Sequence, residues 1–232
     1  MGISFWEALK MKKNNKKTID LWKENYAHDQ ENLYKNKLIQ TLFDLGHRYI
    51  ARQGESITGT ILDIGSGMGY HLKFEKISNE RKYICLDNDP KMLQKIRNKK
   101  VEKIVGNCSN IPLKDKSVDL VIASHILEHL PTLKNDLSEI RRVLKDDGRL
   151  IVVLPCDPGF LWNTATHMSP SRRRLKKIGI DYDEVMKHEH VNTFEKCVSE
   201  LEGSFKIQDR QYYPFLIQNH NFNLICGFTF TK

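Results

Sequence analysis

The chain has 232 residues, 40% of them hydrophobic and 28% charged, with a formal net charge of +8 at pH 7. This composition is typical of a globular domain with a buried core, and no apolar run approaches the roughly 20 residues that cross a bilayer. The N-terminal residues lack the continuous apolar stretch of a secretory signal peptide, so we expect a cytoplasmic protein without a transmembrane segment. The five cysteines form no Cys-x-x-Cys pair, which argues against a zinc ribbon and favours reduced thiols.

An amphipathic helix is predicted ahead of the main domain, over residues 32–52. Leu38, Leu42, Leu45 and Tyr49 recur at i, i+4, i+7 and i+11, which places them on one helix face. We therefore assign residues 1–58 to an N-terminal helical extension or cap and residues 59–232 to the main domain.

From residue 59 onward, short apolar runs alternate with helical patterns, which predicts βαβ units and a parallel sheet. The predicted strands span residues 60–64, 82–86, 102–105, 118–124 and 149–154, and the predicted helices span residues 72–77, 90–98 and 133–144. A helix over residues 192–201 and strands over 205–213 and 224–230 then close the sheet as a hairpin. We expect a doubly wound α/β fold with seven strands, mostly parallel, an antiparallel last strand and helices on both faces.

Residues 156–190 interrupt this pattern after the fifth strand. The segment is rich in proline and glycine and too long for an ordinary connection, so we predict a functional insertion or lid. It also carries a basic run that would attract a phosphate or an anionic membrane surface, made up of Arg172, Arg173, Arg174, Lys176 and Lys177.

A glycine-rich loop follows the first predicted strand. Gly65, Gly67 and Gly69 stand at alternate positions, where glycine permits a positive φ and a close approach of a ligand to the backbone. The spacing is Gly-x-Gly-x-Gly and not the Gly-x-Gly-x-x-Gly of dinucleotide-binding proteins, which disfavours a nicotinamide-dependent dehydrogenase. Asp63, at the strand end, would suit the ammonium and sulfonium of a methionine group.

Asp87 ends the second predicted strand, 22 residues after Gly65. An acidic residue at about this distance accepts hydrogen bonds from ribose hydroxyls in nucleotide-binding α/β domains. The glycine loop and this carboxylate together predict a site for a nucleoside-containing cofactor.

These motifs, followed by Gly106-Asn107 and by residues 118–130, occur in the order of the class I methyltransferases, which the chain resembles over residues 60–155. The resemblance implies a Rossmann-like methyltransferase fold with S-adenosylmethionine as cofactor and S-adenosylhomocysteine as product. It places the methionine part on the glycine loop, the ribose on Asp87 and the adenine by residues 88, 107 and 108. The implied cofactor-binding residues are Asp63, Gly65, Ser66, Gly67, Gly69, Asp87, Asn88, Asn107, Cys108 and, folded over the cofactor from the N-terminal segment, Tyr26.

The strand end at Ser124-His125 borders the methyl-transfer pocket in such relatives. His125 is therefore a candidate base, since imidazole titrates near neutral pH, or it only shapes the pocket. The letters from His125 to His129 also spell His-x-x-Glu-His, a zinc-protease signature. Pro131 would end any long helix there and no context supplies a third ligand, so we expect no metal site.

A second polar cluster, residues 187–192, lies at the end of the insertion and contains His188 and His190. We interpret both histidines as candidates for acceptor binding or base catalysis; the alternative is a surface loop in which Asn192 caps the next helix. Together with Pro155 and Pro214, the segment also resembles a methyltransferase subgroup of polysaccharide biosynthesis. The resemblance implies methyl transfer to an oxygen or nitrogen of a small molecule, such as a sugar or a phosphate-linked glycan precursor.

Two other functions stay open. The positive charge also suits a nucleic-acid methyltransferase, although no Asn/Asp-Pro-Pro-Tyr/Phe segment follows residues 118–124 to hold a flipped base. A non-catalytic partner subunit would keep the cofactor motifs without turnover. The sequence does not specify the oligomeric state.

Overall fold

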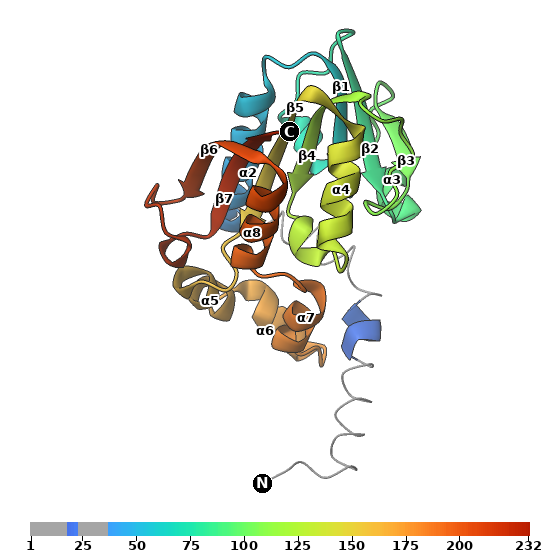
Figure 1. The fold of residues 1–232 in the computed structure, drawn as a ribbon. Coiled ribbons are helices and arrows are strands. Elements are labelled where there is room, and N and C mark those ends of the chain that lie inside the picture. The colour runs from blue at the N-terminus through green and yellow to red at the C-terminus, as the bar shows by residue number, and fades with distance from the viewer. Residues whose placement is uncertain (1–17, 23–36) are drawn as a thin grey trace.

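The computed structural model describes residues 18–22 and 37–232 (Figure 1). Tyr26 and the first part of the predicted N-terminal helix lie outside the described residues, so the predicted contact of Tyr26 with the cofactor stays a prediction. Residues 18–22 are helical, and α2 spans Lys37–Gly54. No helix in these two described ranges is long and apolar enough to cross a membrane.

The described part of the chain contains a seven-stranded sheet in the order β3-β2-β1-β4-β5-β7-β6. Strands β1 to β5 pair in parallel, whereas β7 runs antiparallel to both of its neighbours. The sequence prediction of a doubly wound, mostly parallel sheet is therefore confirmed. The strands are β1 (Gly59–Ile64), β2 (Arg81–Asp87), β3 (Glu102–Val105), β4 (Val118–Ser124), β5 (Leu144–Pro155), β6 (Lys206–Tyr213) and β7 (Ile225–Thr231).

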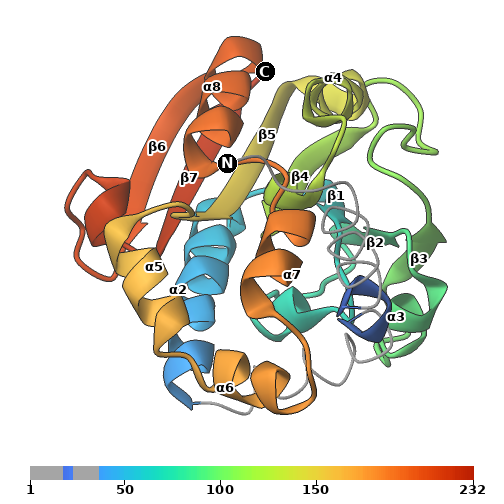
Figure 2. The same cartoon turned by 90° about the horizontal axis from the view of Figure 1, so that it is seen from below.

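Helices cover both faces of the sheet, because successive side chains of each strand point to opposite faces. Leu62 and Ile64 of β1 belong to the core beneath α4 (Leu133–Val143) and α8 (Phe194–Ser204), whereas Ile61 belongs to the core beneath α2. Figures 1 and 2 show α4 and α8 on one side of the sheet and α2 on the other. Asp63 has the parity of Ile61, so its carboxylate lies on the α2 side.

The connection after the glycine loop differs from the prediction. Residues 72–77 do not form a helix; a short 3-10 turn, η1 (Tyr70–Lys73), is followed by an extended segment. Buried Glu75 explains this, because it accepts a hydrogen bond from His71 at 2.9 Å and pairs with Arg81 at 2.8 Å. These side-chain bonds fix the segment against β2. The next helix, α3 (Pro90–Gln94), is also shorter than predicted.

Asn192 does not cap α8, which was the alternative role for this residue. Thr193 is the N-cap, and its side chain accepts a hydrogen bond from the backbone N–H of Lys196. The buried Asn192 amide instead donates to the carbonyl oxygens of Leu127 and Leu130, at 2.9 and 2.7 Å. Asn192 thus ties the end of the insertion to the turn after β4.

The insertion at residues 156–190 consists of α5 (Phe160–His167), α6 (Pro170–Lys177) and α7 (Tyr182–Glu189). Figure 1 shows these helices gathered at the sheet edge where β4 and β5 finish. Leu175, Ile180 and Val185 pack with Trp22 of the N-terminal segment in a small separate core. The insertion therefore stands over the carboxyl ends of the strands, where ligands of doubly wound sheets bind. The division into an extension and a main domain at residue 58 stays a prediction.

Candidate active site

The glycine loop between β1 and η1 makes a left-handed path that only glycine adopts without strain. Gly65 has a φ of 62° and Gly67 a φ of 54°. A Cβ on Gly65 would lie 2.5 Å from the Ile126 side chain, whereas a Cβ on Gly67 would meet nothing within 4 Å. Gly65 is therefore required for packing against the turn after β4, and Gly67 leaves open space in front of its backbone.

Asp87 joins the glycine loop to the end of β2. Its Oδ2 accepts a hydrogen bond from the Gly67 N–H at 2.8 Å, and its Oδ1 accepts one from the Asp89 N–H at 2.9 Å. A carboxylate offers about four acceptor positions, so Asp87 retains capacity for two hydroxyl donors. The residue thus fits the predicted ribose contact and also fixes the shape of the loop.

Asp63 presents a buried carboxylate behind this loop. The residue is 2% exposed, and the Tyr83 hydroxyl donates to its Oδ2 at 3.1 Å. Burial, partly offset by His71 and by this hydrogen bond, raises the pKa of Asp63 to about 6. A cationic ligand group at this point would compensate the buried charge.

A cavity of about 330 Å³ lies between the strand ends and the insertion. Asp63 and residues 65–67 form one wall, and Ser124 and His125 follow from β4. Further lining side chains come from α2 and the insertion: Phe43, His47, Trp162, Tyr182 and His190. Phe43, His47 and Trp162 could not be predicted as lining residues, because no local pattern distinguishes aromatic residues facing a cavity from aromatic residues in the core.

Two of the lining residues, His47 and His71, form a pair of histidines. His47 Nδ1 lies 3.2 Å from His71 Nδ1, and the other nitrogen of His71 donates to Glu75. His71 Nδ1 is then the acceptor and His47 Nδ1 the donor. Burial, reinforced by His71, lowers the pKa of His47 well below its ordinary value, so the His47 ring is neutral at neutral pH.

His125 reaches the cavity in a strained conformation. Its φ is 52°, and its ring meets Phe43 edge-on with the ring centroids 4.9 Å apart. Burial is the largest influence on this imidazole and lowers its pKa to about 4, although Glu128 opposes the effect. His125 is therefore neutral at pH 7 and a weaker base than the sequence analysis assumed.

His190, at the end of the insertion, also lines the cavity. Its Nδ1 lies 2.6 Å from Asp157 Oδ2. Burial disfavours the charged imidazole, but Asp157 and the neighbouring Glu128 and Glu189 outweigh it and raise the pKa of His190. The Asp157–His190 pair fixes the ring and directs its Nε2 away from the carboxylate.

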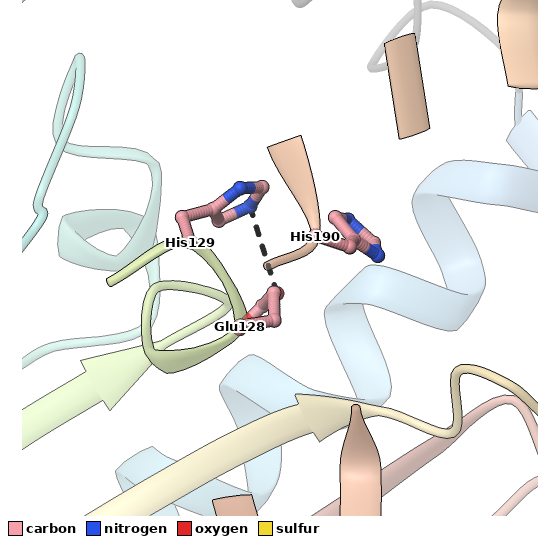
Figure 3. A group of neighbouring side chains, drawn as sticks. All are labelled: Glu128, His129 and His190. Atoms are coloured by element: carbon pink, nitrogen blue, oxygen red, sulfur yellow. Dashed lines mark ion pairs between the residues drawn. The ribbon is translucent and has the colours of Figure 1, made fainter. Parts of the chain in front are cut away.

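Figure 3 shows His190 facing Glu128 and His129, which lie on the turn η2 (Leu127–His129) after β4. All three residues line the cavity. His188, by contrast, is about half exposed, sits beside Glu189 and does not line the cavity. The structure thus brings His125 and His190 of the three predicted histidines to the cavity.

The predicted adenine contacts lie beyond this cavity, at the ends of β2 and β3. Asn88 and Asn107 are exposed there, and the Asn107 side chain accepts from the Ser109 N–H at 3.2 Å. Cys108 is a core residue, 5% exposed, and burial raises the pKa of its thiol to about 12. Gly69 packs against Leu72 and Ile96. Only backbone groups of Cys108 and Gly69 remain as candidate ligand contacts.

Residues 62–152 match the family model described as "Methyltransferase domain". The fold is that of the class I methyltransferases. A SAM-dependent methyltransferase of Thermotoga maritima superposes with a TM-score of 0.64 over 91% of this chain and 99% of that one, at 18% identity.

Two curated proteins are similar over parts of their length. The uncharacterized protein MJ0638 of Methanocaldococcus jannaschii is 39% identical over 94 residues, which cover 40% of each chain. The malonyl-[acyl-carrier protein] O-methyltransferase of Yersinia pestis is 29% identical over 154 residues, which cover 65% of this chain and 51% of that protein. The chain thus spans about half or less of the length of these relatives.

Proposed function

We propose that this protein is an S-adenosylmethionine-dependent methyltransferase that acts on an oxygen or nitrogen of a small molecule. The observation that carries the proposal is the cavity, which is lined both by the glycine loop with Asp63 and by a cluster of histidine and glutamate side chains. The first group suits the cofactor and the second a polar acceptor.

The residues present fit the cofactor. Gly67 leaves open space before its backbone, and buried Asp63 supplies a negative charge for the methionine ammonium. Asp87 retains acceptor capacity for the ribose hydroxyls. The ends of β2 and β3, which are adjacent in the sheet, would hold the adenine. When bound, S-adenosylmethionine supplies a methyl group that its sulfonium already activates.

The chain's own contribution to the reaction is mainly to position the two reactants, as direct displacement requires an in-line approach of the acceptor atom. Residues of α5 and α7, together with Trp22, line the cavity beside the strand ends. An acceptor hydroxyl must lose its proton during transfer, and the polar cluster around His190 is where that proton would be received. His125 then shapes the pocket through its contact with Phe43.

The acceptor class follows from the enclosure and the charge of the site. A cavity of about 330 Å³ accommodates a small molecule or the end of a larger one. Exposed Arg173, Lys176 and Lys177 on α6 favour an acceptor that carries a phosphate, including a sugar phosphate or glycan precursor. Arg172 contributes less, because Asp183 pairs with it.

Calorimetric titration of S-adenosylhomocysteine into wild type and Asp87→Ala tests the cofactor site. We expect micromolar binding by wild type and a loss of at least tenfold in the variant, because the alanine removes an ionic acceptor and loosens the Gly67 backbone. An Asp89→Ala variant, which removes a nearby carboxylate that caps α3, is the matched control. Equal binding by wild type and Asp87→Ala, or no binding by folded wild type, would refute the proposal.

Acceptor candidates are then screened by the formation of S-adenosylhomocysteine. Turnover with any of them would exclude a non-catalytic partner subunit. Generic RNA or DNA, added at two salt concentrations, would reveal nucleic-acid binding by a salt-dependent change in affinity.

A further inference from the structure

Three potential metal-ligating side chains converge at the acceptor end of the cavity. Glu128 and His129 come from η2, and His190 comes from the end of the insertion, 61 positions after His129. One ligand atom from each lies within 4.8 Å of the other two. Figure 3 shows the three side chains as neighbours that come from these separate segments, with a dashed line between His129 and Glu128.

Both imidazoles are held in the tautomer that binds metals. His129 Nδ1 lies 2.8 Å from the carbonyl oxygen of Glu189, which can only accept, so this nitrogen carries the proton. His190 Nδ1 likewise donates to Asp157 at 2.6 Å. Each ring therefore presents a lone pair at Nε2. A backbone carbonyl or carboxylate behind the ring is the usual outer-shell partner of a metal-binding histidine.

Glu128 lacks the hydrogen bonds that a buried carboxylate needs. The residue is 3% exposed, and its Oε2 has no hydrogen-bond partner in the described part of the chain. Its Oε1 lies 3.8 Å from His129 Nε2 and 3.8 Å from His125 Nδ1, too far for a hydrogen bond. A buried charge in this state is costly unless a cation compensates it.

We propose that Glu128, His129 and His190 bind a divalent transition-metal ion, with the remaining coordination positions open to the cavity. Two imidazoles and one carboxylate form the ligand set of catalytic zinc and of mononuclear iron(II) sites, whereas magnesium and calcium prefer oxygen donors. Ligand atoms of a tetrahedral zinc site lie about 3.4 Å apart. The separations here, none above 4.8 Å, therefore have to shorten by at most about 1.4 Å on binding, within the reach of side-chain rotation.

The ion would act on the acceptor. An oxygen atom bound to a divalent cation loses its proton more readily. With His129 and His190 engaged as ligands, an acceptor hydroxyl that coordinates the ion would release its proton to solvent instead of to a histidine, and its oxygen would then accept the methyl group as S-adenosylhomocysteine leaves. This consequence rests on the proposed methyltransferase function and favours acceptors with a hydroxyl or carboxylate oxygen. Metal binding itself does not rest on that function and is tested separately.

The test is titration calorimetry of Zn²⁺ into tag-free, chelator-treated full-length protein. We expect one ion per chain, with an affinity that falls at least tenfold in His129→Ala and in His190→Ala. Asp157→Ala should weaken binding 10- to 100-fold, because it removes only the outer-shell acceptor of His190. His188→Ala is the matched control, since this exposed histidine lies two positions from His190 outside the cluster, and it should bind Zn²⁺ like wild type.

Glu128→Gln keeps the shape of the side chain and provides a second test if an alanine variant fails to fold. We expect it to lose Zn²⁺ binding while S-adenosylhomocysteine binding persists, because the proposed cofactor residues belong to other elements, the glycine loop and the ends of β1 and β2. Wild type without a bound ion, or Glu128→Gln and both histidine variants binding Zn²⁺ like wild type, would overturn the metal site. If wild type does not bind S-adenosylhomocysteine, the proposed function is overturned, and the Zn²⁺ result is unaffected.

Discussion

Replacing Asp63 by asparagine should stabilise the protein while removing a cofactor contact. The carboxylate is 2% exposed and its pKa rises from 3.8 to about 6, chiefly because burial disfavours the charge. One pH unit of difference between the folded and unfolded pKa corresponds to about 1.4 kcal/mol. The ionised Asp63 therefore destabilises the native state by about 3 kcal/mol at pH 8. Asparagine keeps an acceptor for the Tyr83 hydroxyl and removes the charge.

The sign of the pH dependence follows from the raised pKa. Between pH 4 and pH 6 the native state binds a proton at Asp63 that the unfolded state has released, so the wild type loses stability as the pH rises through this window. Asparagine does not titrate. The advantage of Asp63→Asn should therefore be small near pH 4, grow up to about pH 6 and stay constant above it.

Urea unfolding of both proteins at pH 4.5 and pH 8 measures this difference. All other titrating groups are common to both proteins, so the pH dependence of the difference between their free energies of unfolding reports on Asp63 alone. We expect this difference to increase by about 2 kcal/mol from pH 4.5 to pH 8. A gap that is the same at both pH values would refute the argument from burial. At pH 8, S-adenosylhomocysteine should bind Asp63→Asn at least tenfold more weakly, since a charge-assisted contact to the ammonium is lost.

Three further substitutions test the loop, the turn and the core. Gly67→Ala should lower the melting temperature slightly, because alanine disfavours a φ of 54° by about 1 kcal/mol. The same variant should abolish cofactor binding in calorimetry, because its methyl group enters the open space in front of the loop. Asn192→Ala should reduce the free energy of unfolding by about 2–3 kcal/mol in urea titrations, since two buried carbonyls lose their donor; a change below 0.5 kcal/mol would contradict this. Tyr49→Phe should cost about 1 kcal/mol by the same assay, because the buried hydroxyl bonds Asp209 and Thr229 at 3.0 and 2.9 Å.

The sheet could be predicted from the sequence because its signals are local. Short apolar runs marked β1, β2, β3 and β4 to within a residue or two of their observed bounds, and the glycine loop and Asp87 marked the carboxyl ends of two neighbouring strands. Local apolar spacing misled at residues 72–77. There, a side-chain network that includes Arg81 of the next strand fixes a different backbone conformation. Arg81 lies outside residues 72–77, so the local pattern could not reveal this contact.

The polar cluster could not be predicted for a related reason. The His-x-x-Glu-His letters were visible, but η2 is a 3-10 turn and His125 has a positive φ, so the two histidines of the motif do not act as neighbours on an α-helix. The third member, His190, reaches Glu128 and His129 because the insertion folds back and Asn192 ties it to η2. This convergence depends on tertiary structure alone. The candidate ligand set is therefore Glu128, His129 and His190, and not the pair His125 and His129 that was considered from the sequence.

Two buried carboxylates, Asp63 and Glu128, line the cavity, and a bound ligand best explains each of them. Each is a buried carboxylate with too few donors from its own chain: Asp63 has one hydroxyl, and one oxygen of Glu128 has no partner in the described residues. Buried charges of this kind lower stability unless a counterion arrives, and departures from the rules of folding concentrate at functional sites. The two carboxylates line one cavity, which is the arrangement expected when one binds a cofactor ammonium and the other a metal ion beside the acceptor.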